Sequence, residues 1–258
     1  MSLKTIIILQ TIHQKPLNKP EIYLNYNMEK KVIVLSLGGS MIVPDKINNE
    51  FLNKFKKVLE KNKNKYKFVV VCGGGSIART YIHGLDNENI KNKEYFQSLL
   101  GISVTRLNAR FLTYFFGKDA NQGIPHDMKE IESMLKFNDF VFCGALRYAK
   151  KQTSDSTSAK LAHYFNSDFI NLTNVNGLYD KNPKKFKSAK FIPEINHKDF
   201  LKIANQIKFK PGQNFVLDQT AAKIIKKHNI TTYILGPDIE NLDKVLNNKY
   251  FIGSRIKG

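Results

Sequence analysis

Two glycine-rich turns are the features of this sequence best suited to chemistry. Gly38-Gly39-Ser40 and Gly73-Gly74-Gly75 each follow a continuous apolar run. Glycines let a backbone approach a ligand closely, and the free N–H groups of such a turn point at a phosphate when a helix follows. Neither turn matches the P-loop or the GxGxxG dinucleotide fingerprint. One such turn could be a tight strand-to-helix corner, but two of them, on strands expected to be neighbours, predict phosphate binding.

Arg79 is the cation best placed to assist these turns. It lies four residues after Gly75, near the start of a helix expected from about Ser76. From there a guanidinium can fold back onto the loop and hold a phosphate with two charge-assisted hydrogen bonds. The alternative is an ordinary surface arginine. The chain has 36 Lys and only 5 Arg, so Lys supplies its surface charge and the functional interpretation is favoured.

A third polar cluster is the run Thr153-Ser154-Asp155-Ser156-Thr157, which precedes an apolar helix expected over 156–166. In a purely structural interpretation, Asp155 or Ser154 caps this helix. In a functional one, the hydroxyl and N–H groups form another anion site, and Asp155 holds Mg²⁺ or orients nearby lysines. The residues alone leave both interpretations open.

The other reactive side chains do not suggest a different chemistry. The six His have no metal-ligand spacing, and Cys72 and Cys143 end buried strands, so no metal site made by the protein is predicted. No GxSxG elbow or Cys/His signature is present. Phosphoryl transfer remains, because positioning and electrostatics supply most of its catalysis and no protein nucleophile is needed.

Strands and helices alternate along the chain, which predicts a mainly parallel α/β sheet whose strand ends carry the site. Strands are expected at 32–37, 68–72, 139–143, 169–173 and 231–235. Helices are expected around 51–59, from Ser76, as a helical pair around 95–116, and over 156–166, 200–207 and 220–228. A polar loop over 174–190 and a hairpin-like end complete the prediction.

Composition limits the class of protein. The chain has 258 residues, 42% of them hydrophobic, with a net charge of +19, which excludes disorder and coiled coil. Two cysteines and the lack of an apolar run of membrane-spanning length predict a cytoplasmic protein without a membrane partner. The lysines are interspersed with 26 Asn as in solvated turns, so no nucleic-acid partner is predicted. Residues 1–27 are expected to be an irregular, dispensable extension, and 28–258 a single domain.

Five blocks in the same order resemble the amino-acid kinase superfamily and, within it, the archaeal-type uridylate (UMP) kinases. They are the runs 35–40 (LSLGGS), 71–79 (VCGGGSIAR), 101–109 (GISVTRLNA), 173–179 (TNVNGLY) and 217–225 (LDQTAAKII). GGGSIAR followed by TRLNA is similar to uridylate kinase, whereas isopentenyl phosphate kinases carry a His after the glycine turn.

The resemblance implies a three-layer αβα sandwich that transfers the γ-phosphoryl group of ATP to UMP, with Mg²⁺ carried by the nucleotide, as a homo-oligomer that is usually a hexamer. It assigns ATP to Gly38, Gly39, Ser40, Gly75, Thr173, Tyr179 and Asn182. It assigns UMP to Gly74, Arg79, Ser98, Ala145, Thr153 and Ser154. Gly39, Ser40 and Asp155 would be catalytic, which resolves the role of Asp155 in favour of function.

Several positions depart from the family pattern. Ser36 stands where many members have a catalytic Lys, so Lys181 or Lys150 could replace it. Ser98 stands where an acidic residue usually binds the ribose, and the loop 146–152 is longer and more basic than usual. These departures leave two alternatives open: a kinase of the same superfamily with another phosphate or carboxylate acceptor, and a non-catalytic nucleotide-binding oligomer.

Overall fold

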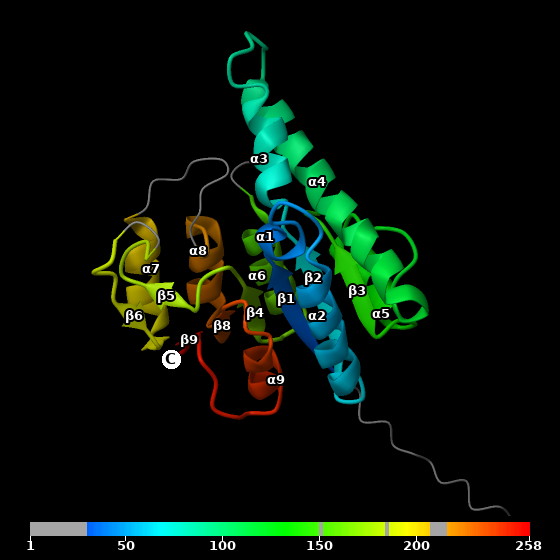
Figure 1. Ribbon diagram of the computed structural model, residues 1–258, viewed down its shortest axis with the longest axis vertical. Helices are drawn as coiled ribbons and strands as arrows, with labels where there is room; N and C mark the ends of the chain where they lie inside the picture. The colour runs from blue at the N-terminus through cyan, green and yellow to red at the C-terminus, as the bar shows by residue number, and fades with distance from the viewer. Residues whose placement is uncertain (1–29, 150–151, 184–185, 207–215) are drawn as a thin grey trace, which may run out of the picture.

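The computed structural model describes residues 30–149, 152–183, 186–206 and 216–258 (Figure 1). Its strands are β1 (Lys31–Leu37), β2 (Tyr66–Cys72), β3 (Phe140–Cys143), β4 (Phe169–Leu172), β5 (Leu178–Tyr179), β6 (Phe191–Ile192), β7 (Glu194–Ile195), β8 (Thr232–Leu235) and β9 (Ser254–Ile256). Its helices are α1 (Gly39–Ile42), α2 (Asn49–Asn62), α3 (Gly75–His83), α4 (Lys93–Phe116), α5 (Met128–Leu135), α6 (Ser154–Tyr164), α7 (His197–Asn205), α8 (Gln219–His228) and α9 (Glu240–Leu246). The extension expected over residues 1–27 lies outside the described residues.

A seven-stranded sheet, in the order β3-β2-β1-β4-β8-β9-β7, forms the centre of the molecule. β1 is parallel to β2 and β4, β2 to β3, and β4 to β8. Only the pairing of β8 with β9 is antiparallel within this sheet as described. The predicted α/β class with a mainly parallel sheet is therefore confirmed.

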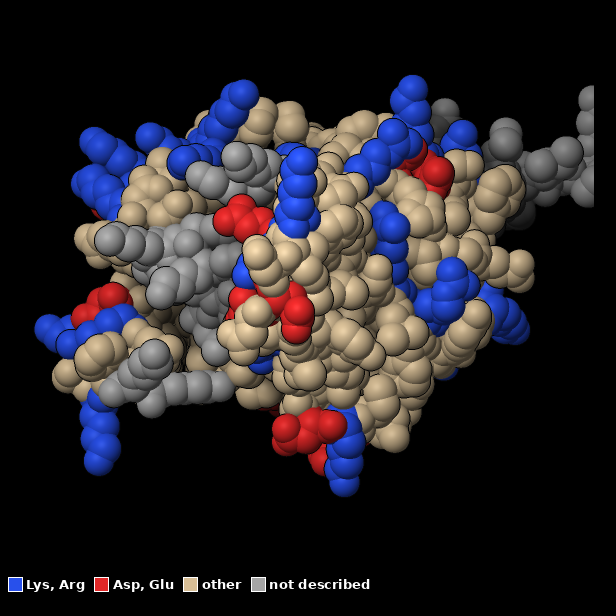
Figure 2. Space-filling view, turned by 90° about the horizontal axis from the view of Figure 1, so that it is seen from above, with Lys and Arg blue, Asp and Glu red and all other residues tan. Residues whose placement is uncertain are grey.

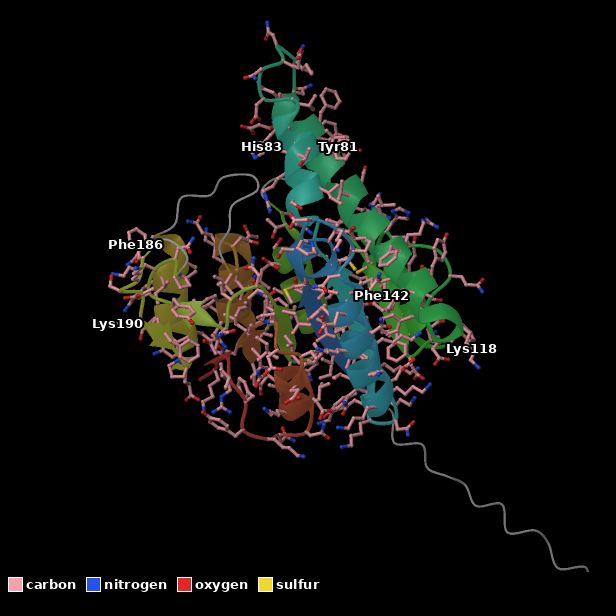
Figure 3. All side chains as sticks on the ribbon, viewed as in Figure 1. Tyr81, His83, Lys118, Phe142, Phe186 and Lys190 are labelled. Carbon is pink, nitrogen blue, oxygen red and sulfur yellow. The ribbon has the colours of Figure 1, made fainter. Side chains whose placement is uncertain are left out.

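Helices cover both faces of the sheet, because its strands are apolar on both sides. One core joins strand residues such as Leu35 and Phe68 to α2, α4 and α9. The other joins Val34 and Val69 to α5, α6, α7 and α8. Phe142 contributes from β3 and lies 4.6 Å, centroid to centroid, from Phe116 of α4 (Figure 3). These two cores make the three-layer αβα sandwich.

The helices α3 and α4 run side by side and project from the body as an arm (Figure 1). Tyr81 and His83 lie on its α3 side (Figure 3). The predicted helical pair over 95–116 is wrong, because these residues form the single helix α4, which runs from Lys93 to Phe116. The helix α4 does belong to a helical pair, but its partner is α3. Gln97 joins the two by donating to the backbone oxygen of Ile82 at 2.9 Å.

Two predictions near the C-terminus also need correction. The hairpin-like end contains the helix α9, and the strand β9 that follows it pairs antiparallel with β8, the strand before the helix. The polar loop over 174–190 contains β5, which pairs with β6 outside the main sheet. Strands of two or three residues are too short for a sequence pattern to distinguish from loop.

The lysines lie on the surface. On the face that Figure 2 shows, Lys and Arg side chains are spread around the rim, with uncharged surface between them. Several pair with carboxylates, as Lys61 does with Asp243 and Lys63 with Asp119, each at 2.8 Å. This distribution supports the interpretation of solvated surface charge. No helix in the described ranges is both long and apolar enough to cross a membrane.

Candidate active site

The two glycine turns interlock at the carboxyl ends of β1 and β2. The strands are neighbours in register, with Leu37 opposite Cys72, so the turns after them meet. A Cβ atom added to Gly39 would lie 2.1 Å from the backbone nitrogen of Gly75, and one added to Gly75 would lie 2.7 Å from the carbonyl carbon of Gly39. Gly75 also has a φ of +65°, which side chains rarely adopt. Only glycine fits at either position.

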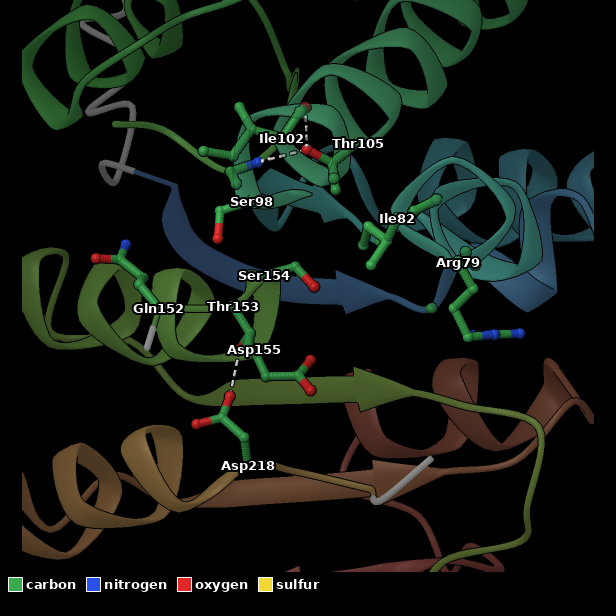
Figure 4. A pocket seen from close by; sticks show the side chains of 18 of the residues that line it. Arg79, Ile82, Ser98, Ile102, Thr105, Gln152, Thr153, Ser154, Asp155 and Asp218 are labelled. Atoms are coloured by element: carbon green, nitrogen blue, oxygen red, sulfur yellow. Dashed lines mark hydrogen bonds between the residues drawn. The ribbon is translucent and has the colours of Figure 1, made fainter. Parts of the chain in front are cut away.

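A cavity of about 510 Å³ opens over these turns and extends across the strand ends (Figure 4). On the β3 side it is lined by α3, α4 and the loop after β3. On the other side it is lined by the end of β4 and the start of α8. The residues that line it include Gly38, Gly39, Ser40, Gly74, Gly75, Ala78, Arg79, Ile82, Glu94, Ser98, Ile102, Thr105, Ala145, Arg147, Tyr148, Thr153, Ser154, Asp155, Asn171, Thr173 and Asp218.

Asp155 lies in the first turn of α6 and points into the cavity (Figure 4). Ser36 of β1 donates a hydrogen bond to its carboxylate at 2.9 Å. Burial and the nearby Asp218 carboxylate raise the pKa of Asp155 to about 7, and the bond from Ser36 offsets part of this effect. A carboxyl with so perturbed a pKa in a cavity is a candidate functional group.

The helix cap at α6 differs from the prediction. Neither Asp155 nor Ser154 caps the helix; the cap is Thr153, whose hydroxyl accepts from the N–H of Ser156 at 3.2 Å. Ser156 completes a capping box by accepting from the N–H of Thr153 at 2.8 Å. Since Thr153 and Ser156 satisfy the helix end, the Asp155 carboxylate is not needed there. The geometry thus removes the structural interpretation of Asp155.

Asp218 is a site residue that the sequence reasoning did not select. It caps α8, accepting from the N–H groups of Thr220 at 2.6 Å and Ala221 at 2.9 Å. The hydroxyl of Thr153 donates to its other oxygen. The only local signal of Asp218 in the sequence is that of a helix cap, a carboxylate directly before the helix expected over 220–228. Asp155 and Asp218 approach the same space from adjacent helices.

Arg79 reaches into this space from α3 (Figure 4). It makes no hydrogen bond or ion pair with any residue in the described ranges, and its side chain is half-buried. It stands one turn beyond Gly74 and Gly75, whose N–H groups belong to the unpartnered start of α3. A free guanidinium beside free N–H groups is the arrangement predicted for phosphate binding.

The run 105–108 (TRLN) in α4 holds the loops of the cavity in place. Asn108 is buried and donates to the carbonyl oxygen of Gly73 at 2.7 Å. Thr105 accepts from the N–H of Ala145 at 3.0 Å. Arg106 donates to the carbonyl oxygens of Ala145, at 3.2 Å, and Leu146. This run therefore positions both the second glycine turn and the loop after β3.

Most predicted site residues come together, and two do not. Gly38, Gly39, Ser40, Gly74, Gly75, Arg79, Ser98, Ala145, Thr153, Ser154, Asp155 and Thr173 all line the cavity. Tyr179 and Asn182 are not among its lining residues. Tyr179 lies in β5, where its ring packs against Phe191 at 5.4 Å between centroids.

The charges around the cavity are unusual for a site that binds anions. No lysine is among its described lining residues; Arg79 and Arg147 are the cations there, against Glu94, Asp155 and Asp218. Of the two lysines suggested as substitutes, Lys181 lies away from the cavity, with its ammonium 5.8 Å from the centre of the Phe186 ring. Lys150 lies outside the described residues. Glu94, one turn before Ser98 on α4, is a carboxylate that the sequence reasoning did not select.

A parallel α/β sandwich with a phosphate-sized cradle at its strand ends defines a class of nucleotide- and phosphate-binding proteins. The chain belongs to the amino acid kinase family, whose model matches residues 31–236. The resemblance seen in the sequence is thereby confirmed.

Archaeal uridylate kinases are among the relatives of this chain. The uridylate kinase of Methanococcus aeolicus is 34% identical over 225 residues, covering 84% of this chain and 96% of that protein. The uridylate kinase of Archaeoglobus fulgidus is 34% identical over 218 residues. The crystal structure of the Archaeoglobus fulgidus uridylate kinase superposes with a TM-score of 0.74, covering 88% of this chain and 99% of that one. A structure of isopentenyl phosphate kinase, 18% identical with a TM-score of 0.63, shares the fold.

Proposed function

We propose that the protein is an ATP-dependent UMP kinase, which transfers the γ-phosphoryl group of ATP to UMP and gives UDP and ADP. The observation that carries the proposal is the pair of interlocked glycine turns with the free Arg79 beside them. Relatives at 34% identity that cover most of the chain support the choice of UMP as acceptor. As an enzyme of pyrimidine nucleotide biosynthesis it would act in the cytoplasm.

The order of the strands supports the placement of the two substrates. In the sheet, β3 and β2 lie on one side of β1, and β4 and β8 lie on the other. The acceptor end would lie toward β3 and would be formed by Gly74, Arg79, Ser98 and Ala145, together with the start of α6. The donor end would be formed by Thr173, which follows β4, with Gly38, Gly39 and Ser40. Gly75 lies between the ends, where the transferred phosphoryl group would pass.

Charge stabilisation would come mainly from backbone groups and Arg79. The starts of α3 and α6 line the cavity, and each presents N–H groups at the positive end of its helix dipole. Such preorganised donors stabilise the spread negative charge of a transferring phosphoryl group. Glu94 and Ser98, on one face of α4, would accept hydrogen bonds from ribose hydroxyls, because the Ser98 hydroxyl itself donates to the backbone oxygen of Glu94. Ser36 would hold Asp155 in the orientation that faces the phosphates.

The donor set fits a magnesium ion carried by the nucleotide. Mg²⁺ prefers oxygen ligands and is usually held by one or two carboxylates together with substrate phosphates. Asp155 and Asp218 supply such carboxylates; burial first, and the Asp218 charge second, raise the pKa of Asp155, and a bound cation would favour its ionised form. When bound, the ion would neutralise phosphate charge. No cluster of three or more His, Cys, Asp or Glu within the described ranges forms a metal site of its own.

The direct test is steady-state phosphoryl transfer from ATP to UMP, CMP and dUMP, compared side by side in an ADP-release assay. We expect turnover with UMP to exceed that with the other two acceptors. If turnover with UMP is no higher than background and another phosphate or carboxylate acceptor is phosphorylated, UMP is not the substrate and that acceptor is.

A second candidate function, a non-catalytic nucleotide-binding oligomer, is favoured by Ser36 and by the absence of lysine from the described lining. It predicts that ATP and UMP bind, with no ADP or UDP formed. Calorimetric titration of both nucleotides, run beside the transfer assay, separates the two candidates.

We also propose that the chain assembles as a homo-oligomer, with a hexamer as the expected size. Leu107 and Tyr114 on α4 are 61% and 72% exposed, and contacts between chains would bury such apolar side chains. Light scattering on a sizing column measures the assembly directly. A monomer at micromolar concentration would contradict the proposal.

A further inference from the structure

An aromatic contact bounds the acceptor end of the cavity. Tyr148, in the loop after β3, lines the cavity, and its ring meets that of Tyr95 on α4 edge-on, with centroids 4.8 Å apart and planes at 89°. A third ring, Phe96, lies 5.7 Å from Tyr95. Tyr148 is nevertheless 42% exposed. Its ring is thus held by one neighbour and still has surface free for a ligand.

Contacts of two arginines lie along the three residues just before Tyr148. Arg106 of α4 holds the carbonyl oxygens of Ala145 and Leu146. Arg147 forms an ion pair at 2.9 Å with Asp127, the residue that caps α5. The Arg106 contacts hold the backbone before Tyr148 and the Tyr95 contact holds its ring, so this ring is partly ordered before a ligand contacts it.

The surroundings of Tyr148 suit a flat, partly apolar group joined to a phosphate. Ala78 and Ile82 of α3 and Ile102 of α4 give the acceptor end an apolar wall (Figure 4). Glu94 and Ser98 add polar groups on α4, and Arg79 lies at the phosphate end. A phosphate site, hydrogen-bonding groups and an aromatic ring in one cavity match the three parts of a nucleoside monophosphate.

We propose that Tyr148 stacks on the base of the acceptor and thereby selects a nucleoside monophosphate over a smaller phosphate ester. The inference rests on the proposed function and specifies the class of acceptor at the same site. Tyr95 is a positioning residue, which acts by holding the ring of Tyr148. Stacking is tolerant of base identity, because every base has a π face. Tyr148 therefore favours acceptors that have a base, and hydrogen bonds distinguish one base from another.

The test measures dissociation constants for UMP and for ribose 5-phosphate, which lacks the base, by calorimetry on the full chain. In Tyr148→Leu we expect UMP to bind about tenfold more weakly, the usual effect of losing one base–aromatic stack. Ribose 5-phosphate should change less than about twofold, because it has no base to stack. Tyr148→Phe keeps the ring and should bind UMP as the wild type does. Tyr250→Leu, at a residue 89% exposed after α9, controls for the Tyr-to-Leu change.

The role of Tyr95 is tested by a double-mutant cycle. Tyr95→Leu should weaken UMP binding by a smaller factor than Tyr148→Leu does. The double variant should match Tyr148→Leu, because the two rings act as one unit. Additive effects would overturn the positioning role of Tyr95.

Three results would overturn the proposal for Tyr148: unchanged UMP binding in Tyr148→Leu, equal weakening of UMP and ribose 5-phosphate, or a Tyr148→Phe variant as weak as Tyr148→Leu. Binding is measured without turnover, so failure of this inference can be distinguished from failure of the kinase proposal. A protein that binds UMP through Tyr148 but does not phosphorylate it would contradict the kinase proposal alone. A UMP kinase indifferent to Tyr148 would contradict this inference alone.

Discussion

At the scale of single residues, the site combines an unpaired cation with a carboxylate that resists ionisation. Arg79 has no partner within the described ranges, and burial together with Asp218 raises the pKa of Asp155 to about 7. The buried Asp155 carboxylate costs stability in the free protein when it is ionised, and a cation carried by the nucleotide would offset that cost. Groups held in this way are characteristic of functional sites.

Replacing Arg79 by Ala should weaken the binding of the acceptor UMP much more than that of ATP. Hydrogen bonds to charged groups contribute about 1.5–3 kcal/mol, so the KM for UMP should rise roughly 10- to 100-fold. The KM for ATP should change much less, since Arg79 lies at the acceptor end. Steady-state kinetics with each substrate varied in turn measures the two effects, and Arg110→Ala, an exposed residue on α4, is the control. Equal effects on both substrates would show that Arg79 is structural or that the two ends are assigned in reverse.

Replacing Asp155 by Asn should stabilise the protein at high pH and inactivate it. A carboxyl whose pKa is higher in the folded state favours folding at low pH, and this contribution is lost as the pH rises from about 4 to 7. Above pH 7 the folded state carries the full penalty, which Asn removes. We expect the free energy of unfolding to rise by about 1–2 kcal/mol at pH 8. This is less than the free energy that corresponds to the whole pKa shift, because the Asp155 side chain is half-buried and solvent screens its charge.

The measurement is denaturant unfolding of both proteins at pH 4 and pH 8. The gain should be present at pH 8 and absent at pH 4, while kcat falls on the order of 100-fold. Asp45→Asn, at an exposed carboxylate, should show neither effect. A gain that is the same at both pH values would mean that ionisation of Asp155 is not its source.

The residue types alone identified much of the site but not its connections. Glycine turns after apolar runs carry a local signal, and all their members line the cavity. Asp218, Glu94 and Tyr148 carry no such signal, because their importance comes from elements that are distant in sequence. Thr153 and Asp218 are 65 positions apart, yet they share a hydrogen bond. Only the packing of α6 beside α8 brings them together.

At the scale of elements, the two glycine turns act as one joint between β1 and β2. Alternating apolar runs were sufficient to predict the long, buried parallel strands. They were insufficient for β5, β6, β7 and β9, which have only two or three residues each. The continuous helix α4, which has Gly101 in its interior, was also missed, since a helical pair was expected there.

Replacing Gly39 by Ala should disrupt this joint. The new methyl group would fall 2.1 Å from the backbone nitrogen of Gly75, and a backbone atom cannot move aside as a flexible side chain can. We expect a loss of about 1–3 kcal/mol of stability, with kcat lowered on the order of 100-fold because the phosphate loops shift. Denaturant unfolding and steady-state kinetics measure the two effects.

Gly101→Ala is the matched control for stability. Its added methyl group would lie 3.5 Å from Ile82, an ordinary contact, inside the helix α4. Alanine in a helix interior should raise stability by about 0.5–1 kcal/mol. If Gly39→Ala were as stable as Gly101→Ala, the turns would not be in the contact described.

At the scale of the whole molecule, the described chain builds its main seven-stranded sheet with a helical layer on each face. The first described strand, β1, begins at Lys31 and lies between β2 and β4 in this sheet. The net charge of +19, spread over the surface, would steer anionic nucleotides toward the cavity and not define a binding surface for nucleic acid.

Deleting residues 1–27 should leave folding and activity intact, since the truncated chain begins at Met28, before β1. The melting temperature and the kcat/KM for UMP of the truncated and full chains are compared. Insoluble or inactive truncated protein would show that the extension contributes to the fold or the site.

The joint between Gly39 and Gly75 also has an evolutionary consequence. Because backbone meets backbone there, the spacing between donor and acceptor phosphates in the proposed arrangement would be set by peptide groups and not by replaceable side chains. Ile82 on α3, Glu94 and Ser98 on α4, and the loop after β3 lie outside the joint, so they could change in sequence without altering that spacing. New acceptors can thus arise by remodelling these walls, while the distance over which the phosphoryl group travels is inherited unchanged.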